Sequence, residues 1–344
     1  MKKVQSFLED LFKQSGKYRL SLDEKSQINK NGMNSFIFAK LSSKKFRKWK
    51  MDEECVNRVR KAIDIHLKKN DALEIIFPQG GYKLWRLPSA PEADWAEFFN
   101  IAYVIKYLAP IASAYKPGVK LTYYLHTLLM ELHDNLTTEE INKYIDSFTH
   151  LVSEFNKFLP KNFKILILKD ADIYPRKEYF EALEKGTKQA KKMYENFTAE
   201  QKNHYYKLGA LNIKWNGKEN WEILSKQEKE KKIYLGSLYE LAATGSLPKV
   251  MDTIKSEDKI LLFTKATGMF IGIGSTKNSI VKYWTGFGVL EQEGDNYYDR
   301  ILSPSQLELV KKEKYEVIKI KNFIPLKNFT EINVYQKRFN FTKK

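Results

Sequence analysis

The sequence predicts an α/β fold with a largely parallel sheet at its core and a β-richer C-terminal part. Three short apolar runs, 72–77, 119–126 and 163–170, have the length and composition of buried strands. Helical patterns separate them, and strands that alternate with helices form parallel sheets. After about residue 205 the helical patterns become rarer, and short strand-like runs with brief turns take their place.

We interpret the first 50 residues as a basic lead-in to this core. They contain one short amphipathic helix and then a passage rich in Lys, Ser and Asn that ends in SSKKFRKWK. We expect this lead-in to pack poorly. From Met51 a helical pattern leads to the first strand, which ends at Pro78 and the glycine pair Gly80 and Gly81.

Two capping boxes predict where the next helices begin. Ser89 and Glu92 have the spacing of the first box, so we expect a helix from about Ala90. Thr137 and Glu140 form the second box, and apolar residues at helical spacing follow them.

The C-terminal part is predicted from strand-like runs together with one helix near 234–243. The chain then divides into a basic lead-in (1–50), an α/β core (51–205) and a β-rich part (206–344) packed on that core. The runs that predict the strands are ALNIKWNG, KILLFTKA, MFIGIGST and YEVIKIKNF.

The glycine-rich segment 270–290 allows two interpretations. Its Ser, Thr and Lys residues after a strand suit a phosphate-binding turn, whereas the same pattern is also typical of a β-hairpin with a small polar turn. The segment lacks the spacing of a Walker loop.

A single cysteine, Cys55, excludes an intramolecular disulfide and a multi-cysteine metal site. We expect neither a cofactor nor a metal.

The charge balance favours anionic partners. There are 59 Lys and Arg residues against 42 Asp and Glu, a formal charge of +17, which suits nucleic acid, an anionic membrane surface or a phosphorylated substrate. Lysines are spread along almost the whole chain, so a compositional bias explains the charge equally well.

The N-terminus lacks the apolar stretch of a targeting signal and no run of 18 apolar residues occurs, so we expect a cytoplasmic protein with no membrane partner.

The segment between the first strand and the next helix is the candidate anion site. Lys83 and Arg86 lie there, close to Gly80 and Gly81. In α/β sheets the carboxyl end of a strand and the N-terminus of the following helix attract anions, so both cations would hold a phosphate or a carboxylate. Alternatively, they form surface ion pairs with neighbouring carboxylates, which would stabilise the protein little.

Three residues are candidates for proton transfer. Asp94 and Glu97 are three residues apart, and we expect them on one helix face, where they could orient an amine or exchange protons. Carboxylates in a first helical turn are also ordinary partners of the helix dipole. His126 stands at the predicted end of the second strand as an acid, a base or a phosphate contact. A metal site that combines it with His133 and Asp134 would match no established ligand spacing.

Three consecutive segments, FPQGGYK, PEADWAEFF and IASAYKPGVKLTYYLH, resemble the N-terminal pattern of the isonitrile (isocyanide) synthase family, the pyoverdine and dityrosine biosynthesis proteins. In that pattern a strand that ends in Phe-Pro leads into a loop with a lysine, a helix start with carboxylates, and a Tyr-x-Pro-Gly turn before a strand. The resemblance covers about 75–160.

This resemblance implies a Rossmann-like fold and a biosynthetic transferase. The implied reaction converts the α-amine of an amino acid, typically an aromatic one, to an isonitrile with a sugar phosphate such as ribulose 5-phosphate as carbon donor. By position Lys83 matches the loop lysine and Glu97 the helix carboxylate, whereas Arg86 has no counterpart. The chain departs from the family after the second strand, where His126 and its neighbours replace Ser-Asp-Gly.

A nucleic-acid-binding protein is the alternative interpretation. Cations and aromatic residues alternate near the end of the lead-in, a pattern suited to a phosphate backbone and stacked bases. The cations are Lys44, Lys45, Arg47, Lys48 and Lys50, and the aromatic residues are Phe46 and Trp49.

Overall fold

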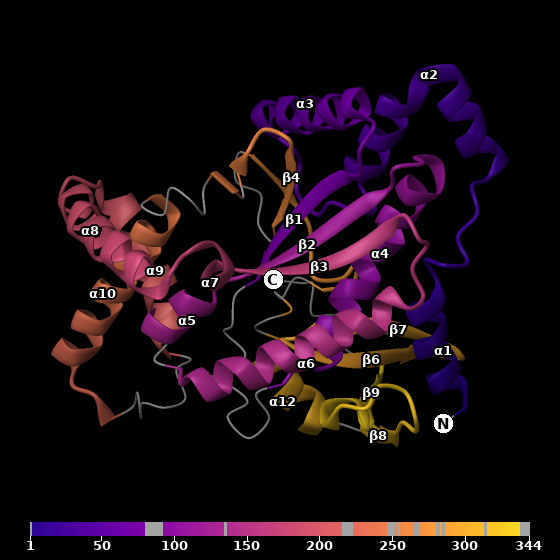
Figure 1. Cartoon of the computed structure of the whole chain (residues 1–344). Coiled ribbons are helices and arrows are strands. Elements are labelled where there is room, and N and C mark those ends of the chain that lie inside the picture. Colours follow the sequence, from indigo (N-terminus) through magenta and orange to yellow (C-terminus); the bar gives the residue numbers. More distant parts are fainter. Residues whose placement is uncertain are drawn as a thin grey trace.

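The computed structural model describes residues 2–79, 92–133, 136–214, 223–245, 252–253, 255–263, 269–279, 283, 286–312 and 315–337. These residues form a five-stranded parallel sheet and a four-stranded mixed sheet, with helices around and between them (Figure 1). The predicted α/β class, with a parallel core and a second sheet in the C-terminal part, is confirmed.

The parallel sheet has the strand order β3-β2-β1-β4-β5. Strand β1 pairs in parallel with both β2 and β4, so the strand order reverses at β1. In such sheets ligands bind in the crevice at the carboxyl ends of the strands, near the point of reversal. Its strands come from both sides of residue 205. They are β1 (Leu73–Gln79), β2 (Val119–Leu125), β3 (Phe163–Lys169), β4 (Lys259–Phe263) and β5 (Phe270–Gly272).

Alternation along the strands gives the parallel sheet two different apolar faces. Tyr123 of β2 packs in the main core, to which α3, α4 and α6 contribute. The next residue, Tyr124, packs on the opposite face with α8 and α10. Helix α3 (Glu53–Lys69) precedes β1. The helices that follow β1, β2 and β3 are α4 (Trp95–Ala114), α5 (Thr127–His133), α6 (Thr138–Asn156) and α7 (Asp170–Ile173).

The first two helices belong to the main core. Helix α1 (Lys2–Lys13) buries Leu8 and Phe12 there, and α2 (Leu22–Leu41) buries Ile37. The expectation of a poorly packed lead-in is therefore wrong, because these apolar faces lie against α4 and its neighbours and not in solvent.

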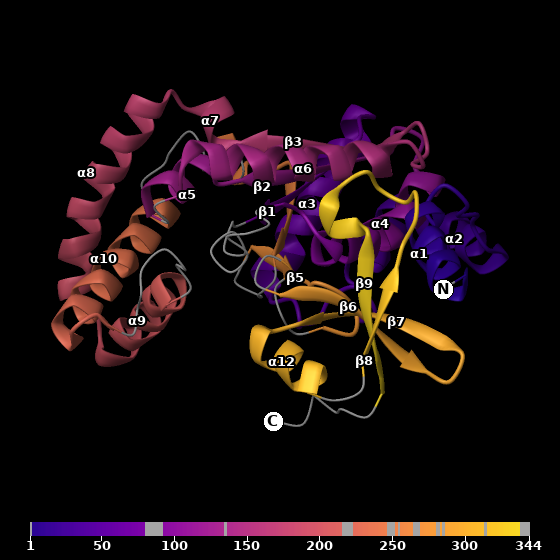
Figure 2. The same ribbon diagram turned by 90° about the horizontal axis from the view of Figure 1, so that it is seen from below.

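Helix α4 lies between the two sheets (Figure 2). Most of its residues are buried, and apolar residues occupy nearly all sides of the helix. Trp95 at its start touches the mixed sheet: its Nε1 donates to Glu331 O at 2.7 Å. A Cβ on Gly288 would lie 2.3 Å from the Trp95 carbonyl carbon, so only glycine permits this approach.

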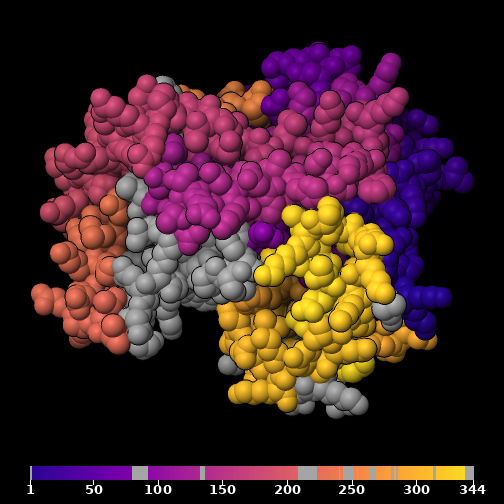
Figure 3. All heavy atoms as spheres, turned by 60° about the horizontal axis from the view of Figure 1, so that its bottom comes forward, coloured from indigo at the N-terminus to yellow at the C-terminus, as the bar shows by residue number. Residues whose placement is uncertain are grey.

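The mixed sheet has the order β7-β6-β9-β8, with β6 and β9 parallel and the other pairs antiparallel. In the space-filling view this part (yellow and gold) lies directly against the magenta segment of α6 (Figure 3). Its elements are β6 (Phe287–Glu293), β7 (Asn296–Leu302), α12 (Pro304–Lys312), β8 (Tyr315–Lys319), η4 (Lys327–Phe329) and β9 (Glu331–Gln336).

Two local predictions in the C-terminal part are wrong. Segment 270–290 is not a hairpin, because β5 pairs with β4 in the parallel sheet whereas β6 belongs to the mixed sheet. The run ALNIKWNG is not a strand in its described part, because 210–214 complete α9 (Ala199–Lys214). That helix packs with α10 (Lys226–Gly245), which in turn packs on α8 (Arg176–Glu195).

In the described part of the chain, no helix is both long and apolar enough to cross a membrane.

Candidate active site

The start of α4 lies at the carboxyl edge of the parallel sheet and carries two carboxylates. Asp94 is the N-cap: its Oδ1 accepts from Ala96 N at 2.7 Å. The Asp94 N–H in turn donates to Glu97 Oε2 at 2.9 Å. The capping box therefore joins Asp94 and Glu97, and the helix begins at Trp95 and not near Ala90.

Two expectations about this region need correction. Asp94 precedes the helix, so it does not share a helical face with Glu97 as the spacing suggested; the two are instead joined through the cap. Glu92 also precedes the helix and does not cap it, and Ser89 lies outside the described residues.

Glu97 is fully buried and accepts a hydrogen bond from a tyrosine of another helix. Tyr144 of α6 donates its hydroxyl proton to Glu97 Oε1 at 3.2 Å. The Gln79 amide, at the end of β1, donates to the same Tyr144 oxygen through Nε2. Burial raises the pKa of Tyr144 far above its usual value and the Glu97 carboxylate adds to the rise, so the hydroxyl stays protonated and serves as a donor.

One turn further along α4, a second buried polar group extends this cluster. Asn100 Oδ1 accepts from the Tyr123 hydroxyl of β2 at 2.9 Å, and Asn100 Nδ2 donates to Ser275 O at 3.4 Å. Tyr283 is also fully buried, with its ring against Phe77 at a centroid distance of 5.7 Å. Burial raises its pKa, with smaller contributions from Tyr123, Tyr144 and Glu97, which places Tyr283 beside these groups.

The arrangement provides a buried carboxylate with an aligned hydroxyl donor. In a site of low dielectric, such a pair can take a proton from a substrate and hold it. Among the described residues, Gln79 Oε1 has no hydrogen-bond partner although it is buried, so it offers an acceptor for a substrate N–H or O–H.

The residues predicted to bind the anion lie outside the described part of the chain: Gly80, Gly81, Lys83 and Arg86. Described residues on either side of segment 80–91 nevertheless contact the cluster. Gln79 precedes the segment, and at its other end Ala93 N donates to Ser147 Oγ of α6 at 2.8 Å.

His126 follows β2, at the carboxyl edge as predicted, but near the other face of the sheet. Its ring packs edge-on against Tyr124 with 4.7 Å between the centroids. Tyr124 points away from the side occupied by Tyr123 and Glu97. The structure therefore joins Asp94 and Glu97 directly and places His126 beside the opposite face.

A second buried carboxylate, Asp170 at the end of β3, was not found by sequence reasoning. Its Oδ1 accepts from Thr127 Oγ1 at 2.6 Å, Leu128 N at 2.9 Å and Ala171 N at 2.9 Å. These bonds tie the start of α5 to the end of β3. The signal that could have revealed it was an acidic residue directly after an apolar strand.

Gln79, Asn100, Tyr123 and Tyr144 were also missed. Each carries a polar group on the buried side of its strand or helix, and a polar group among core-facing positions is the pattern that could have indicated them. No group of three or more His, Cys, Asp or Glu side chains in the described ranges could hold a metal ion.

The basic segment of the nucleic-acid alternative is partly buried. Phe46 is fully buried between Tyr103 and Tyr107, with centroid distances of 6.0 Å and 5.3 Å, so it cannot stack on a base in this structure. Lys48 reaches over Gly274, and burial together with the nearby Arg300 charge lowers its pKa to about 8.

No protein-family model matches the chain, and no curated protein matches it. Among solved structures, the chain is similar to the PvcA protein from Pseudomonas aeruginosa, with a TM-score of 0.64 and 13% sequence identity. The match covers 88% of this chain and 99% of that chain. At this identity the likeness shows a shared fold, in agreement with the Rossmann-like architecture that the sequence resemblance implies.

Proposed function

We propose that this chain is an isonitrile-synthase-like biosynthetic enzyme that acts on the α-amine of an amino acid. The observation that carries the proposal is the buried Glu97 carboxylate, hydrogen-bonded to Tyr144 at the carboxyl edge of the parallel sheet. The fold shared with PvcA and the resemblance of segment 75–160 to the isonitrile synthase family support it.

In the proposed reaction the amine attacks the carbonyl carbon of a sugar phosphate such as ribulose 5-phosphate, and water leaves as the C=N bond forms. The two carbon–carbon bonds of that carbon then break, so that it remains on the nitrogen while the other four sugar carbons depart, and no oxidant is required. An α-ammonium group must lose a proton before its nitrogen can attack, and Glu97 is the group that takes it. Asp94 holds Glu97 in place through the cap, and the rings of Phe77 and Tyr283 suit an aromatic substrate side chain.

The phosphate of the carbon donor is assigned to Lys83 and Arg86, which lie in the sequence between Gln79 and Ala93, two residues that contact the cluster. His126 is assigned a second proton transfer, from the other side of the same sheet edge. No cofactor enters the proposal.

The test is product formation by the purified chain. Aromatic amino acids are incubated with ribulose 5-phosphate labelled with ¹³C, and products are analysed by mass spectrometry. Conversion of the amine to an isonitrile adds one carbon and removes two hydrogens, and the label must appear in the product. If no amino acid gains a labelled carbon with any pentose or pentulose phosphate, the proposal is wrong.

A further inference from the structure

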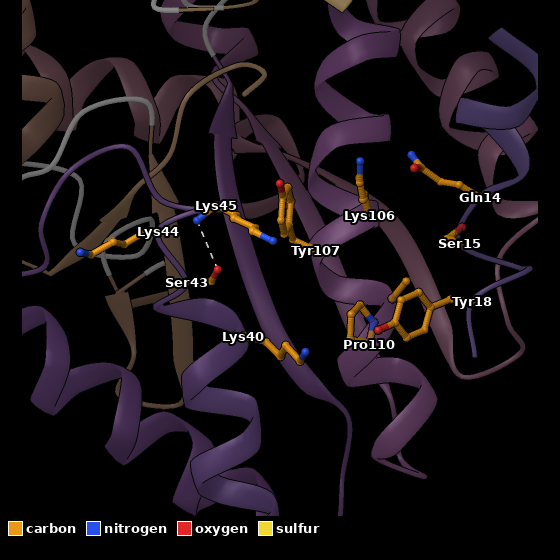
Figure 4. Close-up of a pocket in the computed structure, with 11 residues that line it drawn as sticks. Gln14, Ser15, Tyr18, Lys40, Ser43, Lys44, Lys45, Lys106, Tyr107 and Pro110 are labelled. Carbon is orange, nitrogen blue, oxygen red and sulfur yellow. Dashed lines mark hydrogen bonds between the residues drawn. The ribbon is translucent and has the colours of Figure 1, made fainter. Parts of the chain in front are cut away.

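A cavity of about 600 Å³ lies away from the candidate active site, between the end of α1, the end of α2 and the second half of α4 (Figure 4). Its volume is within the range of small-molecule sites. Lys106 in its wall follows Glu97 by nine residues on α4, roughly 14 Å along the helix axis. The lining residues are Gln14, Ser15, Tyr18, Lys40, Ser43, Lys44, Lys45, Lys106, Tyr107, Ala109 and Pro110.

The cavity wall is positively charged. Four lysines line it and no acidic residue does. Lys40 is paired with Glu24 at 2.5 Å, whereas Lys45 and Lys106 form no close ion pair in the described ranges. Asp299 lies near enough to Lys106 for the two charges to interact, but it does not line the cavity. Lys45 turns its ammonium group toward Tyr107, and Lys44 extends away from the other side chains (Figure 4). The unpaired charge favours an anion.

Ser15 supplies a second, independent indication of a ligand. Its side chain is only 1% exposed, and its Oγ has no hydrogen-bond partner among the described residues. A buried hydroxyl without a partner destabilises the folded chain, and an acceptor oxygen in the cavity would remove that cost. One N–H of the neighbouring Gln14 amide is already bonded, because its Nε2 donates to Ala102 O at 3.0 Å.

The part of the wall beside Lys45 is apolar and aromatic. Tyr107 is half-buried, with its ring packed on Phe46 and Tyr103 at centroid distances of 5.3 Å and 5.1 Å, and Pro110 lies one turn further along α4. A rigid aromatic ring beside unpaired ammonium groups suits a ligand that has both a flat ring and a negative charge.

We propose that this cavity binds a small phosphate ester that carries a ring, of the size of a nucleoside monophosphate. The phosphate contacts Lys45, Lys106 and Ser15, and the ring packs against Tyr107 and Pro110. This site is separate from the proposed active site and does not depend on the proposed reaction.

Calorimetric titration of the full chain with AMP, ribose 5-phosphate and inorganic phosphate tests the proposal. We expect saturable binding with AMP tightest and inorganic phosphate weakest. Lys45→Ala should weaken AMP binding about tenfold or more, as expected for a lost charge-assisted hydrogen bond, and Ser15→Ala a few-fold. Lys30→Ala is the matched control: the same charge is removed from an exposed position of α2 outside the cavity, and AMP binding should not change.

Several results would overturn this site. One is the absence of saturable AMP binding, and another is equal weakening by Lys45→Ala and Lys30→Ala, which would indicate a diffuse attraction for polyanions. Loss of AMP binding in a Lys83→Ala, Arg86→Ala double variant, with normal binding by Lys45→Ala, would place the nucleotide at the active site. That outcome would refute the proposal that the cavity binds the phosphate ester, and it would not affect the proposed enzymatic function.

Discussion

Helices α4 and α6 begin with the same capping box in two different environments. At the start of α6, Glu140 Oε2 accepts from Thr137 N and from Thr137 Oγ1, both at 2.8 Å, close to solvent. At the start of α4, Glu97 makes the equivalent bond to Asp94 but lies between two sheets with no exposed surface. One motif therefore serves as an ordinary helix start in one place and as a candidate catalytic group in the other.

The difference shows what burial adds to a local motif. A cap near solvent stabilises a helix by about 1 kcal/mol whatever surrounds it. A buried carboxylate costs free energy unless polar groups from elsewhere meet it, and here α6 itself supplies the Tyr144 hydroxyl. The carboxylate of the buried cap, Glu97, is therefore the one that packing has placed beside a hydroxyl donor, which makes it a candidate for proton transfer.

The largest expected effect is on turnover in Glu97→Gln. Glutamine at this position keeps the capping box, so the fold should persist, but it cannot accept a proton. We expect turnover to fall by roughly 10² to 10⁴-fold in the isonitrile assay. The matched control is Glu140→Gln, the same change in the same motif on α6, which should leave turnover unchanged. Equal activity of the two variants would exclude Glu97 as the base.

Tyr144→Phe should have the next largest effect. The variant keeps the ring stacked on Phe148, with 6.0 Å between centroids, but loses the donor to Glu97 and the acceptor for Gln79. We expect the free energy of unfolding in urea to fall by about 1–3 kcal/mol. Because the protonated form of Glu97 is no longer disfavoured, the acidic limb of the pH–rate profile should also move to higher pH. A stability loss with an unchanged profile would make Tyr144 purely structural.

Glu24, the capping-box glutamate of α2, is a third case, largely buried but fully paired. Burial raises its pKa, but the Lys40 ammonium, the Tyr18 hydroxyl and the Ser21 N–H outweigh this and bring the pKa to about 2. A folded pKa below the unfolded value means that the carboxylate stabilises the protein above about pH 4.5, and that this contribution disappears as the pH falls toward 2.

Glu24→Gln should therefore lower the free energy of unfolding by about 1–3 kcal/mol at pH 7. The difference from the parent chain should shrink steadily between pH 4.5 and 3 in urea titrations. A difference that stays constant over this range would mean that the charge of Glu24 contributes nothing.

The smallest effect is expected for Thr137→Ala, which removes the exposed cap of α6. The free energy of unfolding should fall by about 1 kcal/mol, with no change in turnover. A marked loss of activity in this variant would show that the start of α6 matters to the site and that the contrast with α4 is not valid.

The sequence by itself determined the elements that depend on neighbouring residues. Strands β1, β2 and β3 and the capped start of α6 follow from local periodicity and from a motif whose partners are three residues apart. It also identified Asp94, Glu97 and His126 as residues at the carboxyl edge, because strand ends and helix starts can be located from the chain alone.

Only the tertiary structure decided where α4 begins and which polar groups meet. Two boxes of equal local quality compete, Ser89 with Glu92 and Asp94 with Glu97, and the observed start at Trp95 places that side chain against the mixed sheet. In the same way β5 and β6 are consecutive strands in the chain but join different sheets.

The site itself follows the same rule. Gln79 and Tyr144 are 65 residues apart and share one hydrogen bond, and Asn100 meets Ser275 across 175 residues. No local sequence pattern predicts such pairs. Each hydrogen bond becomes favourable only when packing removes both groups from water, so that each group has only the other as a partner.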